Sequence, residues 1–338
     1  MKVLVTGASG MLGAATASAL AGRGDTVTVL QRRSAGLGLP EVLADVAEPG
    51  AVRAAVAGRD AVVHLAAKVD FSGPWSDYER INIDGTRNVV DACRRAGVTR
   101  LVHVSSPSVA HAGRSLVGAP AGPADPGAAR GPYARSKAVG EQVALGANSP
   151  DLSVVAVRPH LVWGPGDHQL VARIVARARR KRLVLVGSGA ALVDSTYVGN
   201  AVDALLAALD RCQSAAGRAL VVTNGEPRPV AELLSGICAA AGVAAPTRGV
   251  PAFAAVGAGA VVEQVWAWRY GRRSSAPEPP LTRFLAEQLA TAHWFDQRQT
   301  RELLDWAPRV SLDDGLAELA RSFGRSAAGS YARPPTDL

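Results

Sequence analysis

The sequence predicts an α/β fold in which a doubly wound parallel sheet carries helices on both faces. Short valine-rich runs alternate with longer alanine-rich helical patterns through the first two-thirds of the 338 residues. These runs are almost continuously apolar, which is typical of strands buried on both faces of a sheet. A glycine-rich segment follows the first run and opens a helical pattern, as in the dinucleotide-binding Rossmann fold.

Each element is placed where its pattern begins and ends. Strands are expected at Lys2–Thr6, Thr26–Leu30, Ala61–Ala66, Leu101–Ser105, Ser153–Val157 and Ala219–Thr223. Helices are expected near Leu12–Ala21, Asp77–Arg95, Pro132–Ala147, Gln169–Arg180, Val198–Leu209, Val230–Ala241 and Leu281–Ala290. Because strands and helices alternate, the strands should run parallel.

The chain is expected to divide into two parts and a tail. Residues 1–160 hold the regular alternation and should form the dinucleotide-binding core. Residues 161–325 have more Gly- and Pro-rich loops and should form a smaller, mixed C-terminal substrate lobe that returns segments to the core. Residues 326–338 are small and polar, so a disordered tail is expected. The Ala-, Gly- and Pro-rich stretch Gly118–Pro132 is expected to form a mobile loop.

Composition excludes several classes of protein. The chain is 48% hydrophobic and 20% charged, as expected of a soluble globular protein. The most apolar later stretch, Ala252–Trp268, contains Glu263 and Gln264 and falls short of a membrane span. A charged second residue and early glycines argue against a signal peptide. Three widely spaced cysteines without a Cys-x-x-Cys pattern argue against disulfides and a metal site, so a cytoplasmic location is expected.

One dense basic run, Arg177–Arg182, interrupts otherwise scattered charge in a chain of net charge +8. A solvated helix end is one interpretation, since cations are favourable at a helix carboxyl terminus. Attraction to an anionic ligand, an acidic partner such as another enzyme of the pathway, or a membrane surface is the alternative. No aromatic platform is interleaved with the basic residues, so nucleic acid is not an expected partner.

The segment after the first strand has the spacing of a pyrophosphate-binding loop. Gly7 permits the tight turn, Gly10 lets backbone amides approach a phosphate, and Gly13 lets the helix pack against the strand. The positive end of the following helix should face the phosphates. The cofactor-binding residues expected here are Gly7, Ser9, Gly10, Met11, Leu12 and Gly13.

The end of the second strand indicates the choice of cofactor. Enzymes that prefer NAD usually place Asp or Glu there, whereas this chain has Arg32 and Arg33. Two guanidinium groups suit a 2′-phosphate, although solvated arginines are the alternative. NADP(H) is therefore favoured over NAD(H). Asp45 is placed to meet the adenine amino group. Val46 beside it and Ala66, the last residue of the expected strand Ala61–Ala66, are also expected to bind the cofactor.

Tyr133 and Lys137 are the candidate catalytic residues, together with Ser106. The first two lie four residues apart and share one helix face. Lys137 is expected to lower the pKa of Tyr133 toward neutrality. Ser106 follows a buried-looking strand, where its hydroxyl can donate to a substrate carbonyl. Ser105 and Ser108 compete with it, and a structural turn is the alternative for each. Glycine loop, serine and Tyr-x-x-x-Lys in this order are typical of a nicotinamide-dependent dehydrogenase.

These residues resemble the extended short-chain dehydrogenase/reductase family over nearly the whole chain. Further segments that carry the resemblance are His64–Ala67, Asn82–Asn88, Arg158–Asp167 and Tyr197–Asn200. It implies that Ser106, Tyr133 and Lys137 form a triad, with Tyr133 and Lys137 also contacting the cofactor. It also implies that Asn82 supports a water or backbone link behind the triad. The backbone near Pro159 and His160 would contact the nicotinamide amide.

Within that family the chain is similar to the 3β-hydroxysteroid dehydrogenase-type branch. It looks closer still to the 2-alkyl-3-oxoalkanoate reductases of long-chain olefin biosynthesis, on segments Ser106–His111, Trp163–Leu170, Asn224–Pro227 and Pro279–Leu289. The resemblance implies NADPH-dependent reduction of a long-chain, lipid-like 2-alkyl-3-oxoalkanoate to the 2-alkyl-3-hydroxyalkanoate. The alternatives are an NAD-dependent 3β-hydroxysteroid dehydrogenase, a sugar-nucleotide epimerase, disfavoured by the missing acid, and a non-catalytic dinucleotide-binding protein.

Two expectations concern surfaces. The segment Phe253–Tyr270 would make an apolar helix near the substrate pocket, and a helix buried against its own core is the alternative. Trp266 and Trp268 lie two apart, so they cannot share one helix face. The family often dimerises through a helix pair on the flank of the sheet, so the resemblance implies a homodimer. Peripheral association with a membrane is compatible with the sequence.

Overall fold

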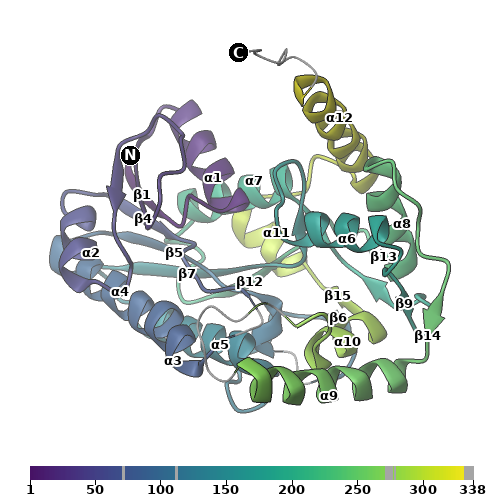
Figure 1. Ribbon diagram of the computed structural model, residues 1–338. Coiled ribbons are helices and arrows are strands. Elements are labelled where there is room, and N and C mark those ends of the chain that lie inside the picture. Colours follow the sequence, from purple (N-terminus) through teal and green to yellow (C-terminus); the bar gives the residue numbers. More distant parts are fainter. Residues whose placement is uncertain (71–72, 111–112, 271–276, 278, 331–338) are drawn as a thin grey trace, which may run out of the picture.

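A seven-stranded parallel sheet forms the centre of the molecule (Figure 1). The computed structural model describes residues 1–70, 73–110, 113–270, 277 and 279–330. The sheet order is β12-β7-β5-β4-β1-β2-β3. Its strands are β1 (Lys2–Thr6), β2 (Thr26–Gln31), β3 (Glu41–Leu43), β4 (Ala61–His64), β5 (Arg100–Val104), β7 (Ser153–Pro159) and β12 (Ala219–Val222). The order reverses at β1, so the predicted doubly wound parallel sheet is confirmed.

Helices cover both faces of this sheet. Helices α1 (Met11–Gly22), α7 (Val198–Asp210) and α11 (Arg298–Leu304) pack on one face, and α2 (Pro49–Val56), α4 (Gly85–Ala96) and α5 (Gly131–Leu145) on the other. Strand β1 shows why the strands read as continuous apolar runs. Val3 and Val5 belong to the core under α1 and α7, whereas Leu4 belongs to the core under α2 and α4.

The C-terminal part adds smaller sheets and a helical layer. A four-stranded sheet has the order β13-β10-β15-β6, and two further pairs are β11-β8 and β14-β9. The strands are β6 (Leu116–Ala119), β8 (Val162–Trp163), β9 (Leu185–Val186), β10 (Leu192–Val193), β11 (Thr196–Tyr197), β13 (Arg228–Pro229), β14 (Gly249–Val250) and β15 (His293–Phe295). The helices are α6 (Leu170–Arg179), α8 (Val230–Ala240), α9 (Ala252–Tyr270), α10 (Arg283–Ala290) and α12 (Leu312–Ser330).

The helix expected over Asp77–Arg95 is divided into three segments. They are α3 (Trp75–Tyr78), a π-helical turn η1 (Glu79–Asp84) and α4. The π turn inserts an extra residue into the helix and places Asn82 in the interior, where it is buried. Gly85 then lies so close to the next layer that a Cβ there would be 2.8 Å from Cγ2 of Val46. Apolar periodicity could not reveal this change of helical pitch.

The loop before α5 and the end of the chain can also be compared with expectation. The loop expected at Gly118–Pro132 begins inside β6 and ends inside α5, and its Gly122 carbonyl accepts a hydrogen bond from Arg158. A 3-10 turn η2 (Pro107–Ala110) follows β5.

Helix α12 continues past residue 326, where a tail was expected, and residues 331–338 lie outside the described residues. Among the residues described, no helix has the length and apolar character needed to cross a bilayer.

Candidate active site

The glycine loop lies between β1 and α1 and has the geometry of a phosphate site. Gly7 has a φ of 79°, and a Cβ there would lie 2.7 Å from the backbone nitrogen of Ala66. A Cβ on Gly13 would lie 2.3 Å from the Gly7 carbonyl oxygen. Gly10 is the N-cap of α1, no side chain caps this helix end, and its first turn holds no acidic residue. The residues present therefore fit a pyrophosphate at the amino end of α1.

The end of β2 is organised so that Arg32 and Arg33 face solvent. Gln31 is buried, and its Nε2 donates to Oε1 of Glu41 at 2.9 Å. The Ala35 amide donates to the same oxygen at 3.0 Å, which fixes the intervening turn. Glu41 is thus committed within the turn. Both arginines are exposed, and neither makes a hydrogen bond to another residue in the part of the chain that the structure describes.

Asp45 brings a third arginine to this end of the sheet. Arg80 Nη1 donates to Asp45 Oδ2 at 2.8 Å, and the Ala47 amide donates to Oδ1 at 3.0 Å. Burial raises the pKa of Asp45, but the hydrogen bonds of Ala47 and Arg80 and the nearby charge of Arg32 hold it below its ordinary value. Arg80 was missed from the sequence, because it lies on η1, 35 residues away along the chain. The exposed guanidinium groups of Arg32 and Arg80 therefore flank one carboxylate.

The structure brings Ser106 and Tyr133 together. Their side chains form a hydrogen bond, although they come from the end of β5 and the start of α5. The Ser108 hydroxyl donates to Ser106 Oγ at 3.0 Å, and its amide contacts the same oxygen at 3.3 Å. Ser105 is buried, and its hydroxyl has no hydrogen-bond partner among the described residues. Ser106, and not either competitor, is therefore the serine next to Tyr133.

Lys137 lies one helical turn after Tyr133 and is buried. Its Nζ donates to the Val104 carbonyl at 2.6 Å. Burial lowers the pKa of Lys137 to about 8, and the carboxylate of Glu141 opposes that shift. The expected lowering of the Tyr133 pKa is wrong for this structure. Burial raises the pKa of Tyr133, and the hydrogen bond with Ser106 only partly offsets that effect. Tyr133 therefore carries its proton at neutral pH and is suited to donate it.

A buried ion pair fixes α5 to the sheet behind these residues. Arg158 on β7 and Glu141 on α5 each have side chains only 1% exposed. Arg158 Nε donates to Glu141 Oε2 at 2.8 Å, and Nη2 donates to Oε1, so the contact is bidentate. Its Nη1 donates to the Gly122 carbonyl at 2.7 Å. One guanidinium thus ties together β7, the catalytic helix and the loop before Tyr133.

A chain of buried hydrogen bonds connects the glycine loop to η1. The Ala66 amide donates to Thr6 Oγ1 at 3.1 Å, and Thr6 Oγ1 lies 2.8 Å from His64 Nδ1. On the other side of the ring, His64 Nε2 lies 3.2 Å from Thr86 Oγ1, whose proton goes to the Asn82 carbonyl at 2.7 Å. Since Thr86 donates to Asn82, it must accept from His64, so the ring is protonated on Nε2 and accepts from Thr6 on Nδ1.

The chain continues from Asn82 to the catalytic helix. Asn82 Nδ2 donates to Ser136 Oγ at 2.9 Å, and the Ser136 hydroxyl donates to the Tyr133 carbonyl at 2.9 Å. The amide of Lys68 donates to Asn82 Oδ1 at 2.7 Å. Burial and the charge of Lys137 lower the pKa of His64 to about 3, so the ring stays neutral. This connection depends on five separate elements and gave no local signal in the sequence.

Pro159 and His160 end β7 beside this site. Proline has no amide proton, and the His160 amide already donates to the Val222 carbonyl at 3.1 Å. The His160 carbonyl accepts from Thr196 Oγ1 at 2.7 Å. Neither residue has a free backbone amide proton. The expected contact with a nicotinamide amide would therefore use the backbone carbonyl oxygens of Pro159 and His160.

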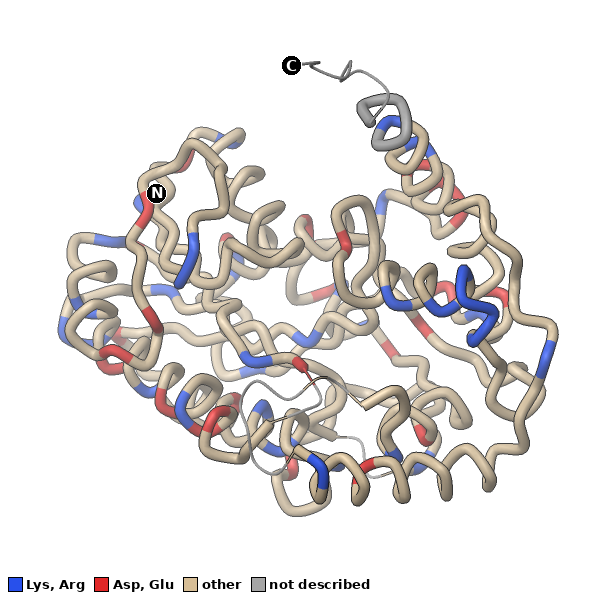
Figure 2. The backbone as a smooth tube through the Cα atoms, in the orientation of Figure 1, with Lys and Arg blue, Asp and Glu red and all other residues tan. Residues whose placement is uncertain are grey.

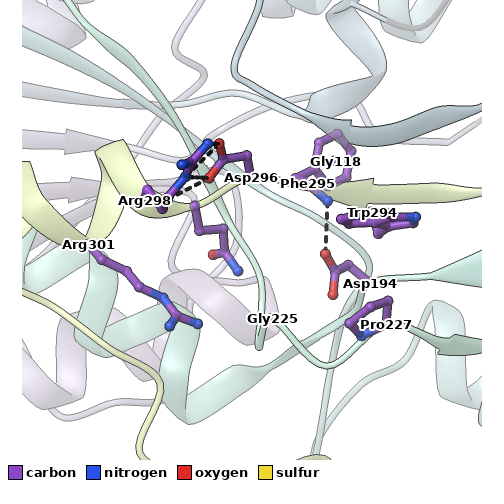
Figure 3. A pocket seen from close by; sticks show the side chains of 10 residues that line it. Gly118, Asp194, Gly225, Pro227, Trp294, Phe295, Asp296, Arg298 and Arg301 are labelled. Carbon is purple, nitrogen blue, oxygen red and sulfur yellow. Dashed lines mark hydrogen bonds and ion pairs between the residues drawn. The ribbon is translucent and has the colours of Figure 1, made fainter.

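A cavity lies in the C-terminal part, and none of the three triad residues lines it (Figure 3). It has a volume of about 450 Å³ and is lined by Gly118, Asp194, Gly225, Pro227, Trp294, Phe295, Asp296, Gln297, Arg298 and Arg301. Asp194 lies at its wall, and Oδ2 accepts the Phe295 amide at 3.0 Å. Burial raises the pKa of Asp194 to about 6, against the opposing effects of its hydrogen bonds and the charge of Arg301. The sequence gave no sign of this cavity.

Asp194→Asn is expected to stabilise the protein near neutral pH. Because burial raises its pKa, the Asp194 carboxyl is protonated in the folded state between about pH 4 and pH 6, whereas it is ionised in the unfolded state. Stability attributable to this group is therefore lost as pH rises through 6, by at most about 3 kcal/mol. Thermal unfolding from pH 4 to 7.5 should show the Tm of the variant rising relative to the unmodified protein.

The matched control is Asp296→Asn in the same cavity. Arg298 holds the pKa of Asp296 at about 2, so its ionisation does not change between pH 4 and 7.5. Its Tm difference should stay nearly constant above about pH 5, where this carboxyl is ionised in the unfolded state as well. A constant Tm difference for Asp194→Asn would contradict the buried-carboxyl interpretation.

Comparisons with known proteins agree with this geometry. The family model described as the NAD dependent epimerase/dehydratase family matches residues 3–223. A 2-alkyl-3-oxoalkanoate reductase of Stenotrophomonas maltophilia is 42% identical over 331 residues, covering 95% of this chain and 99% of that protein. A sterol-4-alpha-carboxylate 3-dehydrogenase, decarboxylating, of Bos taurus is 31% identical over 338 residues, covering 95% of this chain and 92% of that protein.

A solved structure of similar fold is MoeE5 in complex with UDP-glucose and NAD. It has a TM-score of 0.72 and 25% identity, and the match covers 97% of this chain and 100% of that chain. The similarity includes the glycine loop and continues through the C-terminal part, because it spans nearly both chains.

Proposed function

Since the chain belongs to the NAD dependent epimerase/dehydratase family and is an extended short-chain NAD(P)-dependent oxidoreductase, we propose that it reduces a long-chain 2-alkyl-3-oxoalkanoate with NADPH. The product is the 2-alkyl-3-hydroxyalkanoate, an intermediate suited to olefin biosynthesis. The observation that carries this proposal is full-length similarity, at 42% identity, to a reductase of that name.

The proposed chemistry assigns a role to each member of the triad. When bound, the nicotinamide cofactor supplies the hydride. Ser106 donates a hydrogen bond to the substrate carbonyl oxygen, and Tyr133 gives its proton to that oxygen as negative charge develops on it. The raised pKa of Tyr133 supports this direction, because the phenol is protonated at neutral pH. Lys137 donates a hydrogen bond to the Val104 carbonyl, which fixes its positive charge one helical turn after Tyr133.

The preference for NADPH rests on positive charge at the end of β2. Arg32 and Arg33 are exposed, and their guanidinium groups make no hydrogen bond to other described residues. Arg80 pairs with Asp45, the carboxylate that also feels the charge of Arg32. Glu41, the acid nearest in this turn, is occupied by Gln31 and Ala35. A 2′-phosphate would meet the arginines here.

Replacing both arginines, Arg32→Ser with Arg33→Ser, is expected to raise KM for NADPH by about 10- to 100-fold, since charge-assisted hydrogen bonds contribute about 1.5–3 kcal/mol. KM for NADH should change by less than about threefold. The control is Arg87→Ser, which removes an exposed arginine of α4 that pairs with Asp84. It should leave both KM values unchanged. Equal loss with both cofactors would refute a role in phosphate selection.

The substrate is tested with purified protein by following cofactor absorbance. Because 3-oxo acids lose carbon dioxide readily, the practical assay oxidises the stable 2-alkyl-3-hydroxy acid with NADP⁺ and compares NAD⁺. Turnover of the hydroxy acid, without turnover of a 3β-hydroxysteroid, is the expected result.

A sterol substrate is the second candidate. The specific observation in its favour is the 31% identity, over nearly the whole chain, to the bovine sterol-4-alpha-carboxylate 3-dehydrogenase. NAD⁺-dependent oxidation of a 3β-hydroxysteroid, with no reaction of the hydroxy acid, would favour it and leave the triad assignment unchanged.

A further inference from the structure

Helix α9 presents four of its large apolar side chains to solvent. Phe253 is 82% exposed and Trp268 is 85% exposed, at opposite ends of the helix. Val261 and Val265 between them are 60% and 46% exposed. The buried residues of α9 are small, Ala255 and Gly259. On the side that carries the exposed residues, helix α9 is therefore not buried against its own core. It runs along the outer edge of the molecule (Figure 1).

The exposed apolar residues form one stripe. At about 100° per residue, Phe253, Val261, Val265 and Trp268 fall within an arc of about 120°, and the stripe is about 22 Å long. The opposite face contacts α10 so closely that a Cβ on Gly259 would lie 2.7 Å from the Arg283 amide nitrogen. Glu263 is on that side too and accepts from the same amide. Trp266 is half-buried, so the expectation that it and Trp268 occupy different faces is confirmed.

A basic cluster lies near the start of α9. It consists of the exposed residues Arg179, Arg180, Lys181, Arg182 and Arg248. The Leu185 amide bonds to the Arg248 carbonyl where β9 pairs with β14, so the two basic segments meet. At about 3.5 Å per residue, Arg248 is at most about 14 Å from the first residue of α9. Figure 2 shows the long basic run beside these strands.

Acidic residues are sparse in the segments that form the stripe and the basic cluster, and Glu263 of α9 lies on the face toward α10. The sequence has no Asp or Glu from residue 168 to 193 or from 233 to 262, the two stretches that supply the basic cluster and most of α9. Arg269 adds an exposed cation next to Trp268. The apolar stripe, with an aromatic residue at each end, suits the acyl-chain region of a lipid bilayer. The cations beside it suit the phosphates of anionic lipids.

We propose that α9 and the basic cluster form a docking surface for an anionic lipid bilayer, with the stripe from Phe253 to Trp268 inserted at the headgroup boundary. A second copy of the chain is a poorer occupant. A two-fold contact through α9 would bring two basic clusters near each other, in a protein of net charge +8. The inference stands apart from the proposed reaction, because lipid binding is measured without substrate or cofactor.

The test is sedimentation of the full-length protein with lipid vesicles. Vesicles of phosphatidylcholine with about 30% phosphatidylglycerol should bind the protein, and binding should weaken as NaCl rises from about 0.05 to 0.5 M. The double variant Phe253→Ser with Trp268→Ser should lower the partition coefficient at least about tenfold. Reductase turnover of the double variant, measured without vesicles, separates this loss from a loss of function.

A matched pair of single variants controls for surface charge. Val261→Asp places a charge in the stripe, whereas Val117→Asp places one on β6 at similar exposure, 60% against 62%. The first should weaken vesicle binding and the second should not. The proposal is overturned if the protein ignores anionic vesicles or if both variants act alike. It is also overturned if the protein is a dimer in lipid-free solution that Trp268→Ser converts to a monomer.

Discussion

Tyr133→Phe is expected to lower kcat by about 10³-fold, within the range that general acid catalysis contributes. The variant keeps the ring and loses only the hydroxyl that bonds with Ser106 and carries the transferable proton. Affinity for NADPH, measured by cofactor fluorescence, should change by less than about threefold. Stopped-flow or steady-state absorbance with the 3-oxo acid or its hydroxy acid measures the loss.

The control for this variant is Ser105→Ala. Ser105 is buried beside the triad, and its hydroxyl makes no hydrogen bond among the described residues, so removal of that hydroxyl should leave kcat within about threefold. Retention of turnover by Tyr133→Phe would refute the catalytic assignment whatever the substrate. A fall in cofactor affinity equal to the fall in kcat would instead place Tyr133 in cofactor binding.

Arg158→Met is expected to lower the free energy of unfolding by about 3–5 kcal/mol, because it leaves a buried carboxylate without its partner. The Glu141 side chain is only 1% exposed, so little water can replace the lost guanidinium in the folded state. Urea unfolding followed by circular dichroism measures the change. The double variant Arg158→Met with Glu141→Leu removes both charges and should recover most of the lost stability.

The same pair should also affect the pH dependence of turnover. Glu141 opposes the burial that lowers the pKa of Lys137 to about 8. Glu141→Gln keeps the shape of the side chain but removes that opposition, so the alkaline limb of the kcat profile should move to lower pH. If Arg158→Met unfolds the protein, Glu141→Gln still provides this measurement. An unchanged alkaline limb would mean that Lys137 ionisation does not govern turnover.

Local patterns predicted the core of the fold well. The glycine loop, β1 and α1 were found because strand, turn and helix signals occur within the first 22 residues. Tyr133 and Lys137 were paired from helical spacing alone, and the structure places both on α5. Ser106 was separated from Ser105 and Ser108 only weakly by sequence, because three neighbouring hydroxyls look alike until a partner from another element selects one.

The sequence by itself determined the alternation of strands and helices, the phosphate loop and the spacing of the catalytic helix, because each depends on residues close together along the chain. The order of the strands in the sheet came only from the structure. The tertiary structure alone decided what depends on distant contacts. Burial, which only packing creates, raised rather than lowered the pKa of Tyr133. Folding also carried Arg80 to Asp45 and turned the large residues of α9 outward. Such features depend on which surfaces meet, and a local pattern does not contain that information.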